Sequence, residues 1–153
     1  MVLSRTCQHA VWVMAVLAKR WMEGQRNWVK AKEIADVIGL PLPMAAKVLQ
    51  RLALAGLLES SRGQKGGFRL RRTPDTITLA DIVASVDGTE SWDGCVLGLP
   101  QCDDLHPCPL HAHWAKVRQP LRQFLSNLRL ADITSTVTAS LKAREKGRSE
   151  GNP

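Results

Sequence analysis

One short segment of the chain gathers three of its four cysteines and three of its four histidines: Cys95, Cys102, Cys108, His106, His111 and His113. The spacing from the first cysteine to His111 is C-x6-C-x5-C-x2-H. Thiolates combined with imidazole select zinc, copper(I) or iron–sulfur clusters, because these metals prefer sulfur and nitrogen donors. In a chain without signs of secretion, such a group is more typical of a metal site than of a disulfide framework.

The wide spacing of these cysteines bears on which metal they could hold. Zinc loops usually contain a close pair of cysteines, whereas the gaps here are six and five residues. A wide loop can wrap a larger inorganic core, so the spacing favours a cluster over a single zinc ion. Zinc, or three unrelated thiols in a mobile loop, are the alternatives. Cys7 stands apart at helical spacing and is expected to be a small buried residue.

The sequence also excludes several classes of protein. A thiol-based redox enzyme built on Cys102 and Cys108 lacks support, because there is no C-x-x-C motif and no acid/base constellation. We therefore expect that the protein is not an enzyme. No apolar run approaches 18 residues, which excludes a transmembrane helix, and the N-terminal stretch does not read as a signal peptide. A cytoplasmic globular protein with no membrane partner is expected.

Positive charge is concentrated in the first part of the chain. The formal net charge is +7, and residues 1–88 carry 13 basic and 7 acidic side chains. Residues 60–74 hold five basic side chains and no acidic one: Arg62, Lys65, Arg69, Arg71 and Arg72. This concentration suits a polyanion, because each neutralised phosphate releases counterions. A solvated basic face is the alternative that charge alone leaves open.

Two short predicted helices joined by a tight turn indicate a helix-turn-helix. A first helix over residues 4–22, which Ser4 can cap, precedes them. The stretch KAKEIADVIG predicts a helix that ends at Gly39, a residue suited to a helix C-terminus. The next helix begins near Pro43, which is tolerated in a first turn, and ends at Gly56.

A basic hairpin follows and completes the pattern of a winged helix. Residues 57–61 and 68–72 read as two short strands, and the sequence RGQKGG between them supplies the glycines that a tight hairpin needs. Thr78 and Asp81 then form a capping box that opens another helix. We predict a mainly α fold with a small β-hairpin wing, in which the second helix of the helix-turn-helix lies in the major groove and the wing lies beside it.

The last third of the chain predicts a long helix with an apolar seam. Six apolar side chains recur at steps of four and three residues: Leu110, Trp114, Val117, Leu121, Phe124 and Leu128. Pro120 is expected to kink this helix or remove one hydrogen bond. The seam could pack on its own chain, but pairing with a second copy is favoured and suits two half-sites.

These elements divide the chain into four expected parts. A winged helix-turn-helix domain covers residues 1–88, and a cysteine-rich loop covers 89–109. Dimerisation helices occupy 110–141, including a short helix over 130–141, and a flexible tail occupies 142–153.

Three stretches together resemble the Rrf-two family of bacterial winged-helix regulators: KAKEIADVIGLPLPMAAKVLQRLALAGLLESSRGQKGGFRL, TLADIVASVDG and CPLHAHWAKVRQPLRQFLSNLRLADI. The resemblance covers roughly residues 3–140, and its specific parts are the glycine-rich wing, the three-cysteine loop and the C-x2-H-A-x-W run. It implies a homodimeric, DNA-binding transcription factor with an iron–sulfur cluster as sensor. It also implies a repressor on a palindromic operator in double-stranded DNA.

The resemblance also implies a ligand set. Cys95, Cys102, Cys108 and His111 fall on the positions that ligate a [2Fe–2S] cluster in one branch of the family, and a [4Fe–4S] cluster or zinc are the alternatives. In a nitric-oxide-sensing branch, the fourth ligand is an N-terminal Asp of the other subunit. Gln8 occupies that position here and is a poor anionic ligand, which favours His111. The first cysteine gap is one residue longer than the family's common pattern.

The expected DNA contacts depart from the family in part. Pro43, Met44 and Lys47 stand where relatives present Ser, Tyr and Gln, so the target sequence is expected to differ. Arg62 matches the family and is the best candidate for a minor-groove contact. The full set of candidate contacts is Pro43, Met44, Lys47, Arg51, Arg62, Lys65, Gly66 and Arg69. Alternatives are a winged-helix protein with a structural zinc or no metal, and an interaction module that has lost its operator.

Overall fold

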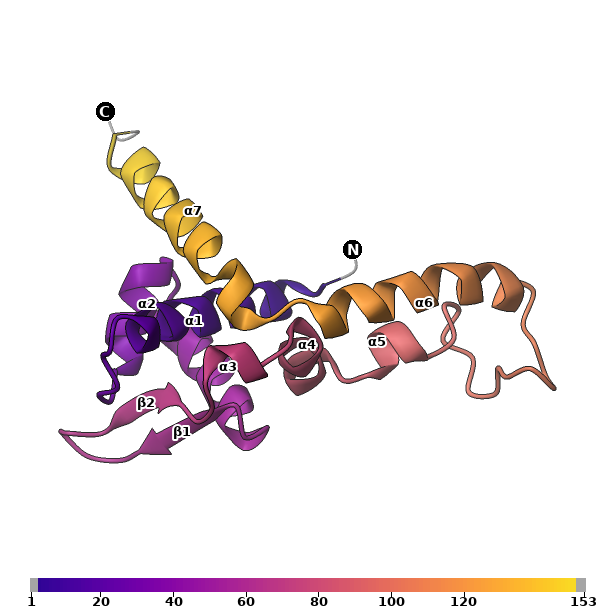
Figure 1. Cartoon of the computed structure of the whole chain (residues 1–153), viewed down its shortest axis with the longest axis horizontal. Coiled ribbons are helices and arrows are strands. Elements are labelled where there is room, and N and C mark those ends of the chain that lie inside the picture. The colour runs from indigo at the N-terminus through magenta and orange to yellow at the C-terminus, as the bar shows by residue number, and fades with distance from the viewer. Residues whose placement is uncertain (1–2, 151–153) are drawn as a thin grey trace.

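The computed structural model describes residues 3–150 and confirms a mainly helical fold with one two-stranded hairpin (Figure 1). The elements, in chain order, are α1 (Arg5–Met22), α2 (Ala31–Ile38), α3 (Leu42–Leu54), β1 (Leu58–Ser61), β2 (Gly67–Leu70), the 3-10 turn η1 (Pro74–Thr76), α4 (Leu79–Asp87), α5 (Glu90–Asp93), α6 (His111–Asn127) and α7 (Leu130–Glu150).

Helix α1 is the central element of the core. Its N-terminus is capped by Ser4, whose hydroxyl oxygen accepts a hydrogen bond from the Cys7 amide at 3.0 Å. The predicted apolar face is confirmed: Val13 and Met14 are fully buried. Cys7 is also fully buried, in a second apolar cluster with Val83, Leu125 and other side chains from α4, α5 and α6. Helix α1 therefore joins the winged helix to the C-terminal part of the chain.

Helices α2 and α3 form the predicted helix-turn-helix, with an angle of 113° between them. Helix α2 ends at Gly39, whose φ of 69° is the left-handed conformation that favours glycine. Helix α3 begins at Leu42, one residue before Pro43. The apolar faces of both helices are buried in the main core, which leaves the opposite face of α3 exposed.

The wing is an antiparallel hairpin in which Leu58 pairs with Leu70 and Ser61 with Gly67. Val29, which precedes α2, forms an isolated antiparallel bridge with Phe68 of β2. A Cβ on Gly66 would lie 2.1 Å from the Ser61 carbonyl oxygen, so this turn requires glycine. The second strand is shorter than predicted and ends at Leu70, before Arg71 and Arg72.

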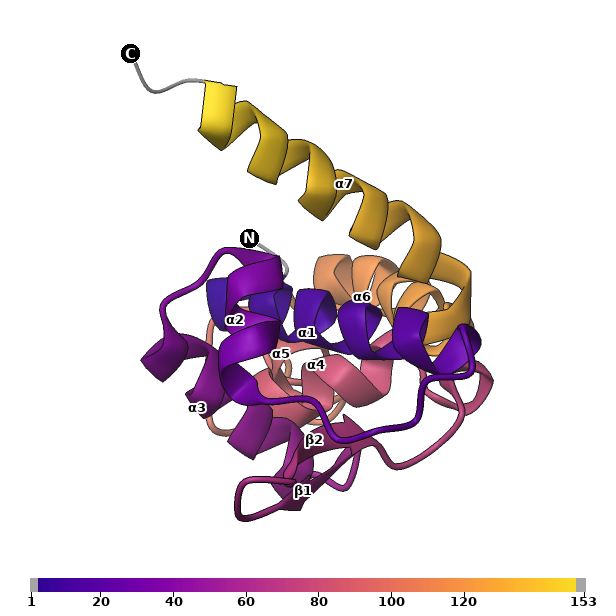
Figure 2. The same cartoon turned by 90° about the vertical axis from the view of Figure 1, so that its left-hand side faces the viewer.

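The C-terminal part differs most from the sequence expectation. Helix α5 interrupts the expected loop, and α7 continues to Glu150 instead of ending at residue 141. Most of the segment expected to be a flexible tail is thus helical, and residues 151–153 lie outside the described residues. Helix α7 passes across α1 on the side away from the hairpin (Figure 2). Arg144 of α7 lies 4.6 Å from the ring centre of Trp12 in α1, a contact that local sequence patterns do not reveal.

In residues 3–150, no single helix is long and apolar enough to cross a bilayer. The bent pair α2–α3 reaches the required length and composition only when its two helices are taken together.

His9 is a polar residue of α1, yet it is only 5% exposed. Its ring lies 5.0 Å from that of Trp12, a packing contact that accounts for its burial. Burial, followed by the charges of Arg5 and Arg144, lowers the pKa of His9 below its ordinary value of 6.5. The folded state therefore favours neutral His9.

This shift predicts a loss of stability in acid. Below pH 6.5 the unfolded chain binds a proton at His9 more readily than the folded chain does. The free energy of unfolding therefore decreases as the pH is lowered. We expect His9→Gln to reduce the loss measured by urea denaturation between pH 7 and pH 5. His113→Gln, at an exposed position, is the control and should leave the loss unchanged. Equal losses in wild type and His9→Gln would contradict the assignment.

Candidate metal centre and nucleic-acid interface

The loop between α5 and α6 brings the three predicted cysteines together. The Sγ atoms of Cys95, Cys102 and Cys108 all lie within 4.8 Å of one another, and those of Cys95 and Cys108 are 3.7 Å apart. These residues are 7 and 6 positions apart in sequence, so only a folded loop can bring them together. All three are partly buried. The spacing therefore does correspond to one site rather than to three separate thiols.

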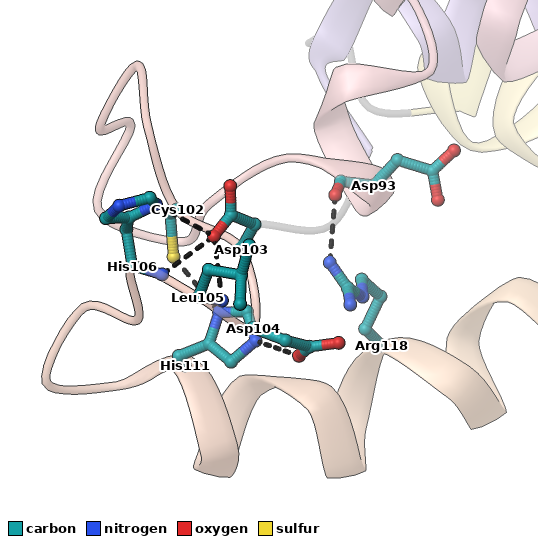
Figure 3. Close-up of polar contacts among 8 residues, drawn as sticks. All are labelled: Asp93, Cys102, Asp103, Asp104, Leu105, His106, His111 and Arg118. Carbon is teal, nitrogen blue, oxygen red and sulfur yellow. Dashed lines mark hydrogen bonds and ion pairs between the residues drawn. The ribbon is translucent and has the colours of Figure 1, made fainter.

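His111, the first residue of α6, lies beside Cys102 and adds an imidazole to the three thiols (Figure 3). Its Nδ1 lies 3.1 Å from Cys102 Sγ, and its Nε2 lies 3.0 Å from a carboxylate oxygen of Asp104. A proton on Nε2 donates to this carboxylate and leaves the Nδ1 lone pair directed at the thiol group. This is the arrangement by which a carboxylate fixes the orientation and tautomer of a metal-ligating histidine.

Asp103 shapes the loop between Cys102 and His111. Its carboxylate accepts hydrogen bonds from the backbone amides of Leu105 at 2.9 Å and His106 at 2.7 Å, as in an Asx turn (Figure 3). The His106 amide, and then that of Leu105, lower the pKa of Asp103, although partial desolvation opposes them. An ionised Asp103 thus turns the chain back toward α6.

Both ends of the cysteine loop are attached to helix α6. The indole N–H of Trp114 donates to the carbonyl of Gly94 at 2.9 Å, directly before Cys95. Arg118 donates to the carbonyl of Asp93 at 3.0 Å (Figure 3). Arg122 forms an ion pair with the Asp93 side chain at 2.5 Å. Since His111 begins the same helix, the first and last members of the donor group are positioned by one rigid element.

The cysteines differ in electrostatic environment. Hydrogen bonds from the backbone of Leu99 and then Leu97 bring the pKa of Cys95 down to about 7, against an opposing desolvation. The pKa of Cys102 is raised: a backbone hydrogen bond from Cys108 lowers it, but desolvation and the neighbouring thiols outweigh that contribution. Burial, and then the charge of Asp87, raise the pKa of Cys7 to about 12, so Cys7 is an inert thiol of the core, as predicted.

The chemistry of the donor side chains limits which metal ion or cluster could bind. Three thiols and one imidazole suit zinc or an iron–sulfur cluster and do not suit calcium or magnesium, which take oxygen ligands. The distances also divide the donors into two close pairs, Cys95 with Cys108 and Cys102 with His111. Two pairs of donors match the two irons of a [2Fe–2S] core, and four donors match one tetrahedral zinc.

Asp104 was not among the predicted site residues, and its position allows a direct test. We expect Asp104→Asn to weaken metal retention by roughly 10–100-fold, because the histidine loses its anionic hydrogen-bond partner. The measurement is a competition titration against a chelator, performed on metal-loaded protein. Asp75→Asn, in the turn η1, is the control and should retain metal normally. Unchanged retention in Asp104→Asn would remove this carboxylate from the site.

The exposed face of α3 and the tip of the wing form the candidate nucleic-acid interface. Pro43, Met44 and Lys47 are exposed on α3, and Arg62 and Lys65 are exposed on the hairpin, as a DNA-contacting surface requires. An open hollow of about 440 Å³ separates the two elements, lined by Gln50, Ala53, Leu54, Ser60, Ser61, Arg62 and Phe68.

Three other candidate DNA contacts have partners within the protein. Gly66 is buried and its amide donates to the Gly63 carbonyl at 3.2 Å, so its observed role is to close the hairpin. Arg69 forms an ion pair with Glu59 at 2.7 Å and stacks over Trp28. Arg51 donates to the Val86 carbonyl of α4 at 3.4 Å. These contacts were not predictable from a local count of basic residues.

Comparison with known proteins assigns the family. Residues 3–136 match Rrf2, described as "Iron-dependent Transcriptional regulator". A putative HTH-type transcriptional regulator of Aquifex aeolicus is 30% identical over 135 residues, which cover 87% of this chain and 91% of that protein. The HTH-type transcriptional regulator IscR of Vibrio vulnificus is 28% identical, with 88% of this chain and 78% of that protein covered.

Solved structures agree with this assignment. The chain superposes on CymR, the global cysteine regulator of B. subtilis, with a TM-score of 0.67 and 26% identity, covering 88% of this chain and 96% of that one. For T. potens IscR the TM-score is 0.66 with 28% identity, covering 88% and 86%. These relatives are regulators rather than enzymes, and their fold includes the long C-terminal helix seen here. The chain therefore belongs to the Rrf2 family of winged helix-turn-helix, DNA-binding transcriptional regulators.

Proposed function

We propose that this chain is a homodimeric repressor whose affinity for a palindromic operator is controlled by an iron–sulfur cluster, a [2Fe–2S] cluster in preference to a [4Fe–4S] one. The observation that carries the proposal is the convergence of Cys95, Cys102 and Cys108 in the loop before α6, with His111 at the start of α6 beside Cys102. The family description, iron-dependent regulation, supports it, and so do the IscR relatives.

The four donor residues would hold the cluster, and the surrounding residues would orient them. When bound, the cluster supplies a redox-active and removable link among the four ligands. Asp104 orients the His111 ring, and Trp114 and Arg118 hold the segment before Cys95 against α6. Ligation would therefore fix the loop on the first turns of α6, and without it the loop would be ordered by hydrogen bonds alone, those of Asp103 among them.

The arrangement of helices offers a physical route from the loop to the DNA-contacting surface. The junction between α6 and α7 is joined to the start of α4 by two backbone hydrogen bonds: the Leu79 amide donates to the Leu128 carbonyl at 2.9 Å, and the Leu130 amide donates to the Ile77 carbonyl at 2.8 Å. Helix α4 in turn receives Arg51 of α3. A change in the placement of α6 is thereby communicated to the recognition helix through α4.

Dimerisation through α6 completes the proposal. Of the predicted seam, Val117 is 56% and Phe124 54% exposed, whereas Leu121 is half-buried against its own chain. Large apolar side chains at this exposure on one helix are typical of an interface that a second copy covers. A two-fold dimer would place two α3 helices on two half-sites of a palindrome.

The decisive experiment is chemical analysis of protein purified without oxygen. We expect a brown protein with visible absorption and with iron and acid-labile sulfide in equal amounts. A colourless protein with stoichiometric zinc and no sulfide would overturn the cluster assignment. The close approach of all three sulfurs, within 4.8 Å, is the observation that favours zinc as the second candidate, because one tetrahedral ion needs its ligands near one another.

The basic side chains of the wing give a separate prediction about DNA. Lys65→Ala should weaken binding to all sequences and reduce the slope of log affinity against log salt by about one unit, because one phosphate contact is lost. Arg62→Ala should weaken operator binding more than binding to random DNA. Lys142→Ala, on α7, is the control. An unchanged salt slope in Lys65→Ala would place that lysine outside the interface.

A further inference from the structure

The DNA-facing end of α3 is apolar. Its first three residues are Leu42, Pro43 and Met44, and Leu42 is 41% and Met44 44% exposed. These side chains are not part of the core, because the buried side of α3 is already formed by other residues: Ala45, Val48, Leu49 and Leu52. Large apolar side chains are therefore displayed at the surface of the helix that the fold assigns to DNA.

The surroundings of this apolar end indicate which partner it meets. Lys47 follows on the same exposed face of α3, and the wing beside it carries exposed Arg62 and Lys65. An apolar spot within a basic surface suits a polyanion that also displays apolar groups, which a DNA major groove does. A mainly apolar protein partner would leave these charges without compensation.

The position of these side chains at the N-terminus of α3 indicates that they contact the edges of the bases. In helix-turn-helix proteins the recognition helix lies in the major groove and its N-terminal residues contact the edges of the bases, whereas the first helix of the motif crosses the backbone. Leu42 and Met44 have no side-chain hydrogen-bonding groups for this task. The C5-methyl group of thymine is the apolar group that unmodified DNA presents in the major groove.

We propose that Leu42 and Met44 recognise the C5-methyl groups of thymines, so that each operator half-site carries thymine opposite the start of α3. This inference rests on the proposed function as a sequence-specific DNA-binding protein, and names the chemistry by which that surface selects its sequence. Lys47, one turn further along, contacts guanine or a phosphate beside these thymines.

The test compares thymine with uracil, which differs only by the missing methyl group. Full-length protein purified without oxygen is used to select binding sites from a pool of random, unmodified duplexes, and each thymine of the selected site is then replaced singly by deoxyuridine. We expect one or two positions in each half-site at which uracil weakens binding roughly fourfold, the equivalent of one buried methyl group.

Variants assign this effect to its side chains. In Met44→Ala or Leu42→Ala the uracil penalty at one of these positions should disappear, because the side chain that covers the methyl group is gone. Both residues are exposed, so the fold should survive, which circular dichroism checks. Met22→Ala is the matched control, because Met22 is 58% exposed at the end of α1 and should leave every uracil penalty intact.

The outcomes separate this inference from the proposed function. A selected site that binds equally well with uracil at every position overturns methyl recognition and leaves sequence-specific DNA binding standing. Uracil penalties that persist in full in both α3 variants likewise overturn it. If selection enriches no sequence at all, both the inference and the proposed operator binding are wrong.

Discussion

A Cys102→Ala variant purified without oxygen should contain no iron or sulfide, and its affinity for the selected operator should differ from that of the wild type by about 5–150-fold, the range of typical allosteric coupling. Substitution of Cys102 is the strongest single test of the site, because its Sγ contacts His111 and lies within 4.8 Å of the other two sulfurs. Its loss removes one donor and one of the contacts between the loop and the start of α6.

The control for this variant is Cys7→Ala, which removes a thiol from the core and leaves the loop intact. It should keep its iron and its operator affinity, although it costs stability because Cys7 is fully buried. Metal and DNA affinity are measured on the same preparations. If Cys102→Ala lacks the cluster but binds every operator as the wild type does, the protein remains a DNA-binding regulator without the proposed sensor.

Phe124→Glu should convert the protein to a monomer and weaken operator binding by roughly a hundredfold or more, because linked half-sites contribute that much through effective concentration. Phe124 is 54% exposed on α6, so a charge there is tolerated by the isolated chain but not inside an apolar interface. Light scattering coupled to size-exclusion chromatography measures the mass, and titration of single and paired half-sites measures the affinity.

Met22→Glu is the matched control for the interface, since it places the same charge at an exposed apolar position on α1. It should remain a dimer. The single half-site gives a further check, because the Phe124→Glu monomer should bind it as the wild type does. A Phe124→Glu protein that stays dimeric would move the interface away from the α6 seam.

The winged helix was predictable because its signals are local. Ser4 and the Thr78–Asp81 capping box are side chains that satisfy backbone groups within their own helix, and both are observed. Gly39 likewise ends α2 through its own backbone conformation. Such features need no knowledge of the rest of the chain, so sequence alone identifies them.

The C-terminal part was less predictable because its stabilising contacts are long-range. Residues 142–150 are polar and carry no apolar periodicity, and their helix is stabilised by contacts such as that of Arg144 with Trp12, more than a hundred residues away. The cysteines could be identified as site residues from their residue type. The roles of Asp104 and Trp114 beside the site could not, because aspartate and tryptophan are also common at ordinary surface and core positions. The ion pair of Arg69 was unpredictable for the same reason, since its partner Glu59 lies across the hairpin, and a DNA contact of Arg69 stays a prediction.

Helix α6 is attached to α5 through Trp114 and Arg118, and the junction between α6 and α7 is attached to the start of α4 through the backbone hydrogen bonds of Leu79 and Leu130. The Leu79 amide belongs to α4 and the Leu130 amide to α7, so the two bonds connect the winged helix with the junction that follows α6. The rates of deuterium uptake at these two amides would report movement of α6 at the end of this helix opposite His111. Hydrogen–deuterium exchange measured by mass spectrometry, on protein with and without its cluster, would thus detect the conformational change between the cysteine loop and the DNA-contacting helix.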